Sequence, residues 1–372
     1  MPNSIQNVGE KPFLNNKGKD GSHVVEVTTS NPAHTSFTDD TYVIRLVGGW
    51  QNDSKGWWYR NADGTYPKSC WKLIDGDYYY FNASGYRVEN KWQGDYYLGS
   101  DGKMVTNAWV GDYHVDAKGK YQKGWIKLEE GWYYLGTTGK VQTGWYQWKN
   151  VWYYGDPKSE NKGLMATGLR EIGTKTYYFS SSGAMQTGWQ VIAGSDYYFA
   201  SSGAMVTNAW AGSYYLGEDG KMVTNAWIGD YYVGATGKYQ KGWLKLVDED
   251  GYINWYYLGT TGKVQNGWYK VKGIWYYGMP DSDPKGKMKT GWLTLGGKTY
   301  YFDESGAMQT GWQVINGSDY YFASSGAMVT NAWVGNYYLK EDGVMACDEW
   351  VDGGKYYVDA SGKWVPGATK TE

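Results

Sequence analysis

The sequence contains few of the residues on which many protein classes depend. Its 372 residues include 2 cysteines, 3 histidines, 8 prolines and 7 phenylalanines. Cys70 and Cys347 are separated by most of the chain, so they do not form a disulfide framework, and we interpret them as isolated small residues. No apolar run is long enough for a membrane span.

Charge is also nearly balanced. Lys and Arg number 36 against 38 Asp and Glu, giving a net charge of -2, and no basic stripe accompanies the aromatic residues. This pattern argues against nucleic-acid binding.

The sequence predicts no catalytic residue, no metal site and no cofactor. His23 and His34 lack metal-ligand spacing such as HExxH, and no GxSxG motif occurs. His114, in "GDYHVDAKG", stands where similar segments have tyrosine, so we interpret it as a substituted ring. Carboxylate pairs such as Glu129–Glu130 fall at predicted hairpin tips, where solvated turns are the ordinary interpretation.

The abundant residues are aromatic residues and glycine. There are 23 Trp, 39 Tyr and 54 Gly, and the rings recur in phrases such as "KGWIKLEEGWYYLGTTGKVQTGW" (123–145). The first tryptophan of each phrase returns most often after 20 or 21 residues, with short steps of 16 or 17 and long steps of 24 or 25, and a period in this range is typical of a solenoid or array. These tryptophans are Trp50, Trp71, Trp92, Trp109, Trp125, Trp145, Trp189, Trp210, Trp227, Trp243, Trp268, Trp292, Trp312, Trp333 and Trp350, with Leu169 filling one gap.

The sequence also has a longer repeat, which contains several of the short ones. "GWQVIAGSDYYFASSGAMVTNAW" (188–210) returns almost unchanged at 311–333. We therefore predict an array of about 15 units over residues 49–372, containing a duplicated block of about 120 residues. Residues 1–48 stand outside the array; "HVVEVTT" (23–29) and "TYVIRLV" (41–47) form one expected strand pair, interpreted as a cap.

Each unit is predicted to be a β-hairpin. In "GWYQWKNVWYYG" we expect strands at 145–148 and 151–154, joined by a turn at Lys149–Asn150. A single hairpin is only marginally stable in water, so the units must stack and bury rings against their neighbours. The fold class is therefore all-β, with some of the rings acting as the core.

The rings exceed what stacking needs. Side chains alternate between the two faces of a strand, so Trp152 shares a face with Trp145, and Tyr153 points the other way. A ring of the next hairpin, such as Tyr177, is expected to complete a cluster of three at the boundary between the two hairpins, which we call a seam. Three ring faces without a strong hydrogen-bonding group suit a quaternary ammonium ion.

Phrases such as "TGWYQWKNVWYYG", "GAMQTGW" and "GKMVTNAW" resemble the choline-binding repeats of streptococcal (pneumococcal-type) surface proteins and their phage lysins. The resemblance covers about residues 49–364. It implies a left-handed solenoid of stacked β-hairpins that binds choline at the seams. It also implies attachment to phosphocholine on teichoic and lipoteichoic acids, by a member without a catalytic module.

The resemblance assigns ligand-binding rings to six seams. Each seam has a first and a second ring position on one hairpin and a closing ring on a following one. The predicted sets are Trp50, Trp57 and Tyr79; Trp71, Tyr78 and Tyr96; Trp125, Trp132 and Tyr153; Trp145, Trp152 and Tyr177; Trp243, Trp255 and Tyr276; and Trp268, Trp275 and Tyr300. Met165 and Met288 are expected to line a remaining wall, with linker packing as their alternative role.

Other units depart from this pattern. The second ring position holds Thr176, Asp196, Thr299 or Asp319 in four of them. The units after Trp92, Trp109, Trp210, Trp227 and Trp333 are about four residues shorter. We expect these units to be structural, or to bind in a modified way.

The expected function is choline binding on the outside of the bacterial wall, restraining wall hydrolases (autolysins) that dock through the same repeats. The first 21 residues lack a signal-peptide core, so the chain is either cytosolic or a mature exported form, and the repeats favour the latter. Two alternatives remain at this point: a surface adhesin that presents a host-binding face, and a glucan-binding repeat protein.

Overall fold

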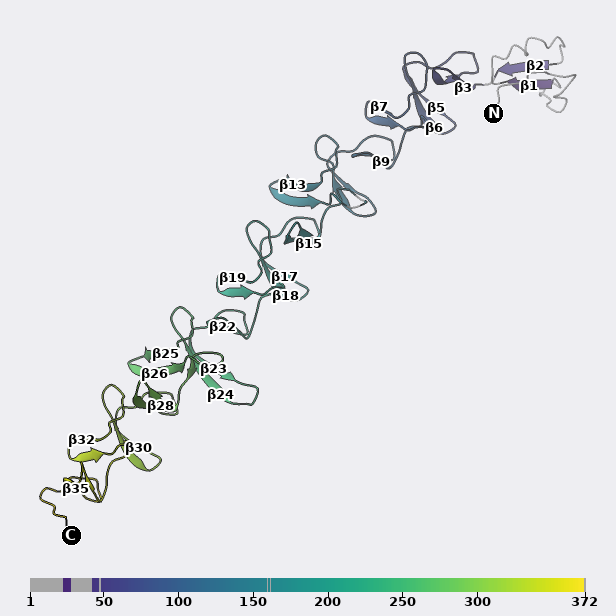
Figure 1. Cartoon of the computed structure of the whole chain (residues 1–372). Coiled ribbons are helices and arrows are strands. Elements are labelled where there is room, and N and C mark those ends of the chain that lie inside the picture. Colours follow the sequence, from purple (N-terminus) through teal and green to yellow (C-terminus); the bar gives the residue numbers. More distant parts are fainter. Residues whose placement is uncertain (1–22, 28–41, 47, 159, 161, 371–372) are drawn as a thin grey trace. The chain divides into compact units, whose positions relative to one another are not determined.

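The computed structural model describes residues 23–27, 42–46, 48–158, 160 and 162–370. In these residues the regular structure is entirely β, and most strands pair only with the next strand along the chain. Figure 1 shows these short hairpins following one another from β3 towards β35. The predicted all-β array of repeated hairpins is confirmed. The described residues contain no helix that could cross a membrane.

The chain divides into two compact units. The first comprises residues 1–170 and 178–185, and the second comprises residues 171–177 and 186–372. The first contains β1 (His23–Val27), β2 (Tyr42–Leu46), β3 (Gly49–Asp53), β4 (Gly56–Arg60), β5 (Cys70–Ile74), β6 (Asp77–Phe81), β7 (Lys91–Gln93), β8 (Tyr96–Leu98), β9 (Ala108–Val110), β10 (Tyr113–Val115), β11 (Trp125–Lys127), β12 (Trp132–Tyr134), β13 (Gly144–Trp148) and β14 (Val151–Gly155).

The boundary between the units falls within β15 (Gly168–Ile172) and β16 (Lys175–Phe179). The second unit continues with β17 (Gly188–Ile192), β18 (Ser195–Phe199), β19 (Ala209–Ala211), β20 (Tyr214–Leu216), β21 (Ala226–Ile228), β22 (Tyr231–Val233), β23 (Gly242–Val247), β24 (Ile253–Leu258), β25 (Gly267–Val271), β26 (Ile274–Met279), β27 (Lys287–Met288), β28 (Gly291–Leu295), β29 (Lys298–Phe302), β30 (Gly311–Ile315), β31 (Ser318–Phe322), β32 (Ala332–Val334), β33 (Tyr337–Leu339), β34 (Glu349–Val351) and β35 (Tyr356–Val358).

The hairpin β13–β14 has the predicted turn and register. Lys149 and Asn150 both adopt positive φ, 48° and 62°, as a two-residue turn matched to strand twist requires. Trp145 pairs with Tyr154 and Tyr146 with Tyr153 across the ladder. Trp145 and Trp152 therefore lie on one face of the hairpin, as predicted.

The N-terminal strand prediction is confirmed in part. β1 and β2 lie within the two expected segments and pair in parallel, with His23 opposite Tyr42. His34 and most of the segment interpreted as a cap lie outside the described residues, so the capping role stays a prediction.

In most units the deepest core position directly follows the last tyrosine of the second strand. In most hairpins this residue is fully buried, with no exposed surface, and it is phenylalanine or an aliphatic residue. These residues are Phe81, Leu98, Val115, Leu135, Phe179, Phe199, Leu216, Val233, Leu258, Phe302, Phe322, Leu339 and Val358. Tyrosines such as Tyr133 and Tyr153 are buried beside this position, so the rings form only part of the core.

Two hairpins have glycine at this position instead. A Cβ on Gly155 would lie 2.4 Å from the carbonyl oxygen of Gln142, and a Cβ on Gly278 would lie 2.4 Å from that of Gln265. The preceding linker passes so close to the strand that a side chain does not fit. Both glycines precede the Pro-containing loops, at 156–163 and 279–286.

Candidate functional site

The linker after one hairpin bonds to the hairpin before it, and this contact builds each seam. The Met165 amide donates to the Trp132 carbonyl at 2.9 Å, and the Met308 amide donates to the Trp275 carbonyl at 2.9 Å. Because the bond crosses the seam, it places the linker side chain next to the rings. Methionine at this position lies against a linker glycine: Gly183 for Met165 and Gly306 for Met288.

The closing rings meet the first tryptophans as predicted. Ring centroids are 4.7 Å apart for Trp50 and Tyr79, and 5.4 Å for Trp71 and Tyr96. The distance is 5.0 Å for Trp125 and Tyr153. In the second unit it is 4.9 Å both for Trp243 with Tyr276 and for Trp268 with Tyr300. Trp145 and Tyr177 belong to different units, so that part of their seam stays a prediction.

Four seams have two tryptophans set as perpendicular walls. The centroid distances are 6.5, 6.4, 6.4 and 6.3 Å, with interplanar angles of 80°, 85°, 82° and 89°. These pairs are Trp125–Trp132, Trp145–Trp152, Trp243–Trp255 and Trp268–Trp275.

The second ring of every predicted seam is exposed, although aromatic side chains usually bury much of their surface. Their exposed fractions are between 37% and 47%. The rings are Trp57, Tyr78, Trp132, Trp152, Trp255 and Trp275. These rings therefore leave apolar surface exposed at the same position of six seams.

The seam of Trp268 contains a cavity of about 260 Å³. It is lined by Trp268, Trp275, Tyr300, Met308 and Ser325. This volume equals roughly eight water-sized groups, which accommodates an organic cation of choline's size. The lining supplies three ring faces, a thioether and one hydroxyl, and no carboxylate.

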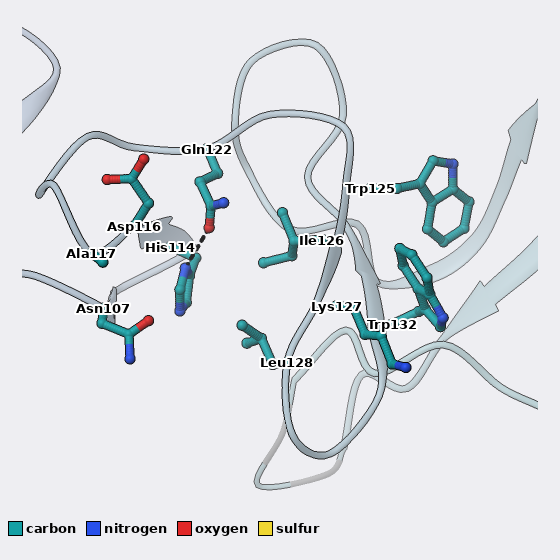
Figure 2. A pocket seen from close by; sticks show the side chains of 10 residues that line it. All are labelled: Asn107, His114, Asp116, Ala117, Gln122, Trp125, Ile126, Lys127, Leu128 and Trp132. Atoms are coloured by element: carbon teal, nitrogen blue, oxygen red, sulfur yellow. Dashed lines mark hydrogen bonds between the residues drawn. The ribbon is translucent and has the colours of Figure 1, made fainter.

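Figure 2 shows how the hairpin β11–β12 separates its two faces. The rings of Trp125 and Trp132 lie together on one side, and Ile126 and Leu128 point to the other, towards His114. His114 is buried, and its Nδ1 lies 2.8 Å from Oε1 of Gln122. The centroid of its ring lies 5.1 Å from that of Trp109, which supports its interpretation as a substituted ring. The described residues contain no cluster of three or more metal-ligating side chains.

The sequence reasoning missed two columns of stacked tyrosines. Tyr146 lies between Tyr134 and Tyr153, with interplanar angles of 15° and 12°, and Tyr269 is stacked in the same way in the second unit. Burial, and then the neighbouring tyrosines, raise the pKa of Tyr146 and Tyr269 well above the ordinary value. The raised pKa values extend the pH range over which these two rings stay neutral towards more alkaline pH. The signal was a tyrosine directly after the first tryptophan, in "GWYQW" and "GWYKV".

The sequence reasoning also missed a cation in the first seam. The Arg87 guanidinium carbon lies 5.3 Å from the Trp50 ring and 5.6 Å from the Trp57 ring. Its Nε and Nη2 donate to Oε1 of Glu89, at 3.0 and 2.5 Å. The Arg87 amide donates to the Trp57 carbonyl, so this arginine occupies the position that Met165 has in its own seam.

Comparison with known families identifies the repeats. A family model described as "Choline-binding repeat" matches residues 86–121, 204–239 and 327–364, and a second of the same description matches 166–210 and 289–333. A third, "Putative cell wall binding repeat", matches 48–66, 71–87 and 123–141. Together these ranges cover more than half of the chain. This chain is a choline-binding repeat protein.

Individual relatives match parts of this choline-binding repeat protein. The lysin of Pneumococcus phage Dp-1 is 38% identical over 63 residues, which are 14% of this chain and 21% of the lysin. The lysozyme of Streptococcus phage Cp-1 is 44% identical over 32 residues, 9% of each protein. The match thus spans about a fifth of the lysin and a tenth of the lysozyme.

Solved structures with similar repeats come from Streptococcus pneumoniae. The choline-binding domain of CbpL is 38% identical, covering 50% of this chain and all of that domain, with a TM-score of 0.40. The modular autolysin LytC, solved with a synthetic peptidoglycan ligand, is 23% identical over 71% of this chain and 52% of LytC, with a TM-score of 0.33.

Arg87 leads to a prediction about the first seam of this choline-binding repeat protein. The guanidinium already lies near both ring faces that a ligand cation would use, so Arg87 should compete with the ligand. Replacing Arg87→Met, the residue found at this position in other seams, should add one choline site per chain, measured by equilibrium dialysis. Arg87→Lys keeps a positive charge and should add none. An unchanged stoichiometry in Arg87→Met would contradict this role.

Proposed function

We propose that this chain binds the choline of bacterial wall teichoic and lipoteichoic acids at its seams. The recurring perpendicular, exposed tryptophan pairs support this proposal most directly. A quaternary ammonium donates no hydrogen bond and is weakly hydrated, so ring faces and a thioether compensate for its lost water. The seam of Trp268 provides such groups around one cavity.

Several binding sites along one chain should make its attachment to the wall polymer firm. We expect one such set of ring faces, which we call a cage, to bind choline weakly. A polymer bearing many cholines engages several cages at once. Linked binding events of this type raise the apparent affinity by about 10² to 10⁴. Attachment should therefore depend steeply on how many cages are intact.

The biological role that we propose is occupation of choline at the cell surface. By covering choline, the chain would restrain wall hydrolases that dock through similar repeats, and it would do so by binding rather than by catalysis. The family matches to the described hairpins all concern repeats of the binding type.

A fluorescence titration tests the ligand class directly. Because the walls of the seams are tryptophans, choline should change the intrinsic emission with saturation in the millimolar range. Dextran at the same mass concentration should leave the emission unchanged. A response to dextran alone would replace choline by glucan as the ligand.

A wall-lysis assay tests the biological role. Purified chain added to choline-containing walls should slow lysis by a choline-dependent hydrolase, and free choline should abolish the difference. A variant lacking residues 1–48 should inhibit equally well, because competition needs only the repeats. Loss of inhibition on this deletion would favour an adhesin-like role for the N-terminal segment.

A further inference from the structure

Three short units contain a ring triad that the six predicted seams do not include. The triads are Trp92, Tyr113 and Tyr121; Trp210, Tyr231 and Tyr239; and Trp333, Tyr356 and Trp364. Within each triad all three pairs of rings are in contact. The last ring of each triad comes from the linker, not from a hairpin.

Two of the triads come close to the geometry of the tryptophan walls, and the third is less perpendicular. The first tryptophan and the linker ring are 6.1 Å apart at 84° for Trp92 and Tyr121, and 6.0 Å at 84° for Trp210 and Tyr239. For Trp333 and Trp364 the values are 6.4 Å and 67°. The walls of the fuller seams lie 6.3–6.5 Å apart at 80–89°.

The backbone explains how a short unit obtains this ring. In a fuller seam, the linker amide donates to the carbonyl of the second ring, as from Met165 to Trp132. In the short units the same bond runs from Tyr121 to Asp95 at 3.0 Å, from Tyr239 to Ser213 at 3.0 Å, and from Trp364 to Asn336 at 2.8 Å. The acceptor residue has lost its ring, and the donor residue supplies one instead.

Three of the triad rings are exposed to solvent, and lysine ammonium groups lie over two others. Trp210 is 36% exposed, and Tyr356 and Trp364 are each 39% exposed. The Lys123 ammonium lies 5.1 Å from the centroid of Tyr121, and the Lys241 ammonium lies 5.5 Å from that of Tyr239. A cation that sheds its water more readily than lysine gains more from the same ring faces.

We propose that the three triads are additional cages for a quaternary ammonium group. This inference rests on the proposed choline binding and extends it to units that the sequence predicts to be structural or to bind in a modified way. All three triads fall within ranges matched by one "Choline-binding repeat" model, 86–121, 204–239 and 327–364.

Two other short units serve as internal controls. The ring centroids of Trp109 and its closing ring Tyr133 are 5.3 Å apart, and those of Trp227 and Tyr256 are 5.1 Å apart. Their linker position is occupied by Val141 and Val264, whose amides donate to the carbonyls of Asp112 and Asp230. These units have the same backbone arrangement with valine in place of the linker ring, so valine is a residue that the fold accepts there.

Equilibrium dialysis of the full chain against labelled choline tests the inference. The triple variant Tyr121→Val, Tyr239→Val and Trp364→Val should bind three fewer cholines per chain than the wild type. A ring-preserving variant, Tyr121→Phe, Tyr239→Phe and Trp364→Phe, should keep the wild-type number. Equal stoichiometry in the valine and phenylalanine variants would overturn the inference and leave the proposed function intact.

A wild-type chain that binds no choline would instead refute the proposed function. Should the valine variant misfold, wild-type crystals soaked in choline give a second measurement. Ligand density among Trp92, Tyr113 and Tyr121 is the expected result, and density confined to the fuller seams would refute the triad cages.

Discussion

Alanine at the six second-ring positions should reduce retention on a choline-bearing surface by about 10² to 10⁴. The affected residues are Trp57, Tyr78, Trp132, Trp152, Trp255 and Trp275. Five of the substitutions remove a ring from a seam that we propose holds choline in the wild type. Trp57 lies in the first seam, where Arg87 already occupies the ring faces, so its loss should add little. Loss of several cages acts through avidity. Because these rings are 37–47% exposed, the array should still fold. Surface plasmon resonance on choline-derivatised and underivatised surfaces measures the change.

The chain offers a matched control for this variant. Six exposed apolar residues that belong to none of the predicted ring sets can be replaced by alanine in the same number. They are Leu73, Val191, Val247, Ile253, Ile274 and Val314, with exposed fractions of 45–72%. Equal losses in both variants would show that general surface hydrophobicity, not the cages, drives retention. Residual binding by the six-ring variant should disappear when the three triads are also removed.

Phe199→Ala should cost about 3–5 kcal/mol of local stability. Phe199 is fully buried at the end of β18, where it fills the deepest core position of its unit. In an array, each hairpin depends mainly on its neighbours, so the damage should concentrate near β17–β18 rather than unfold the whole chain. Native-state hydrogen exchange, read hairpin by hairpin, measures this better than a single melting temperature.

Val191→Ala in the same hairpin is the comparison. Val191 is 70% exposed, so its truncation should change the stability by less than about 0.5 kcal/mol. Uniform loss of protection in distant hairpins after Phe199→Ala would show that the array unfolds cooperatively, against this expectation.

Much of the fold could be predicted because local signals and periodicity agree. The Lys149–Asn150 turn and the shared face of Trp145 and Trp152 follow from hairpin register. The contacts of the five closing rings follow from the stacking of successive repeats. Side chains alternate between the two faces of a strand with a period of two residues, so the face of each residue can be assigned without knowledge of the tertiary fold. The resemblance to choline-binding repeats then assigned a ligand to those faces.

The rest depended on where the linkers run. Arg87 lies in a linker of ordinary appearance, and only the bond from its amide to the Trp57 carbonyl places it over two rings. Tyr121 was absent from the predicted sites for the same reason. The deepest core position was also missed, because residues such as Leu98 and Phe199 contribute one apolar side chain per unit to a sequence dominated by rings.

Each cage that we propose draws its walls from two consecutive hairpins, and this arrangement has a mechanical consequence. Such a cage exists only while its neighbours are docked, so a captured ligand tightens the joint between them. Ligand at 100 times its dissociation constant adds about 2.7 kcal/mol to a one-site equilibrium of this kind. A chain bound along a choline-rich polymer should therefore be stiffer than the same chain without ligand. Proteases should also cut its linkers more slowly.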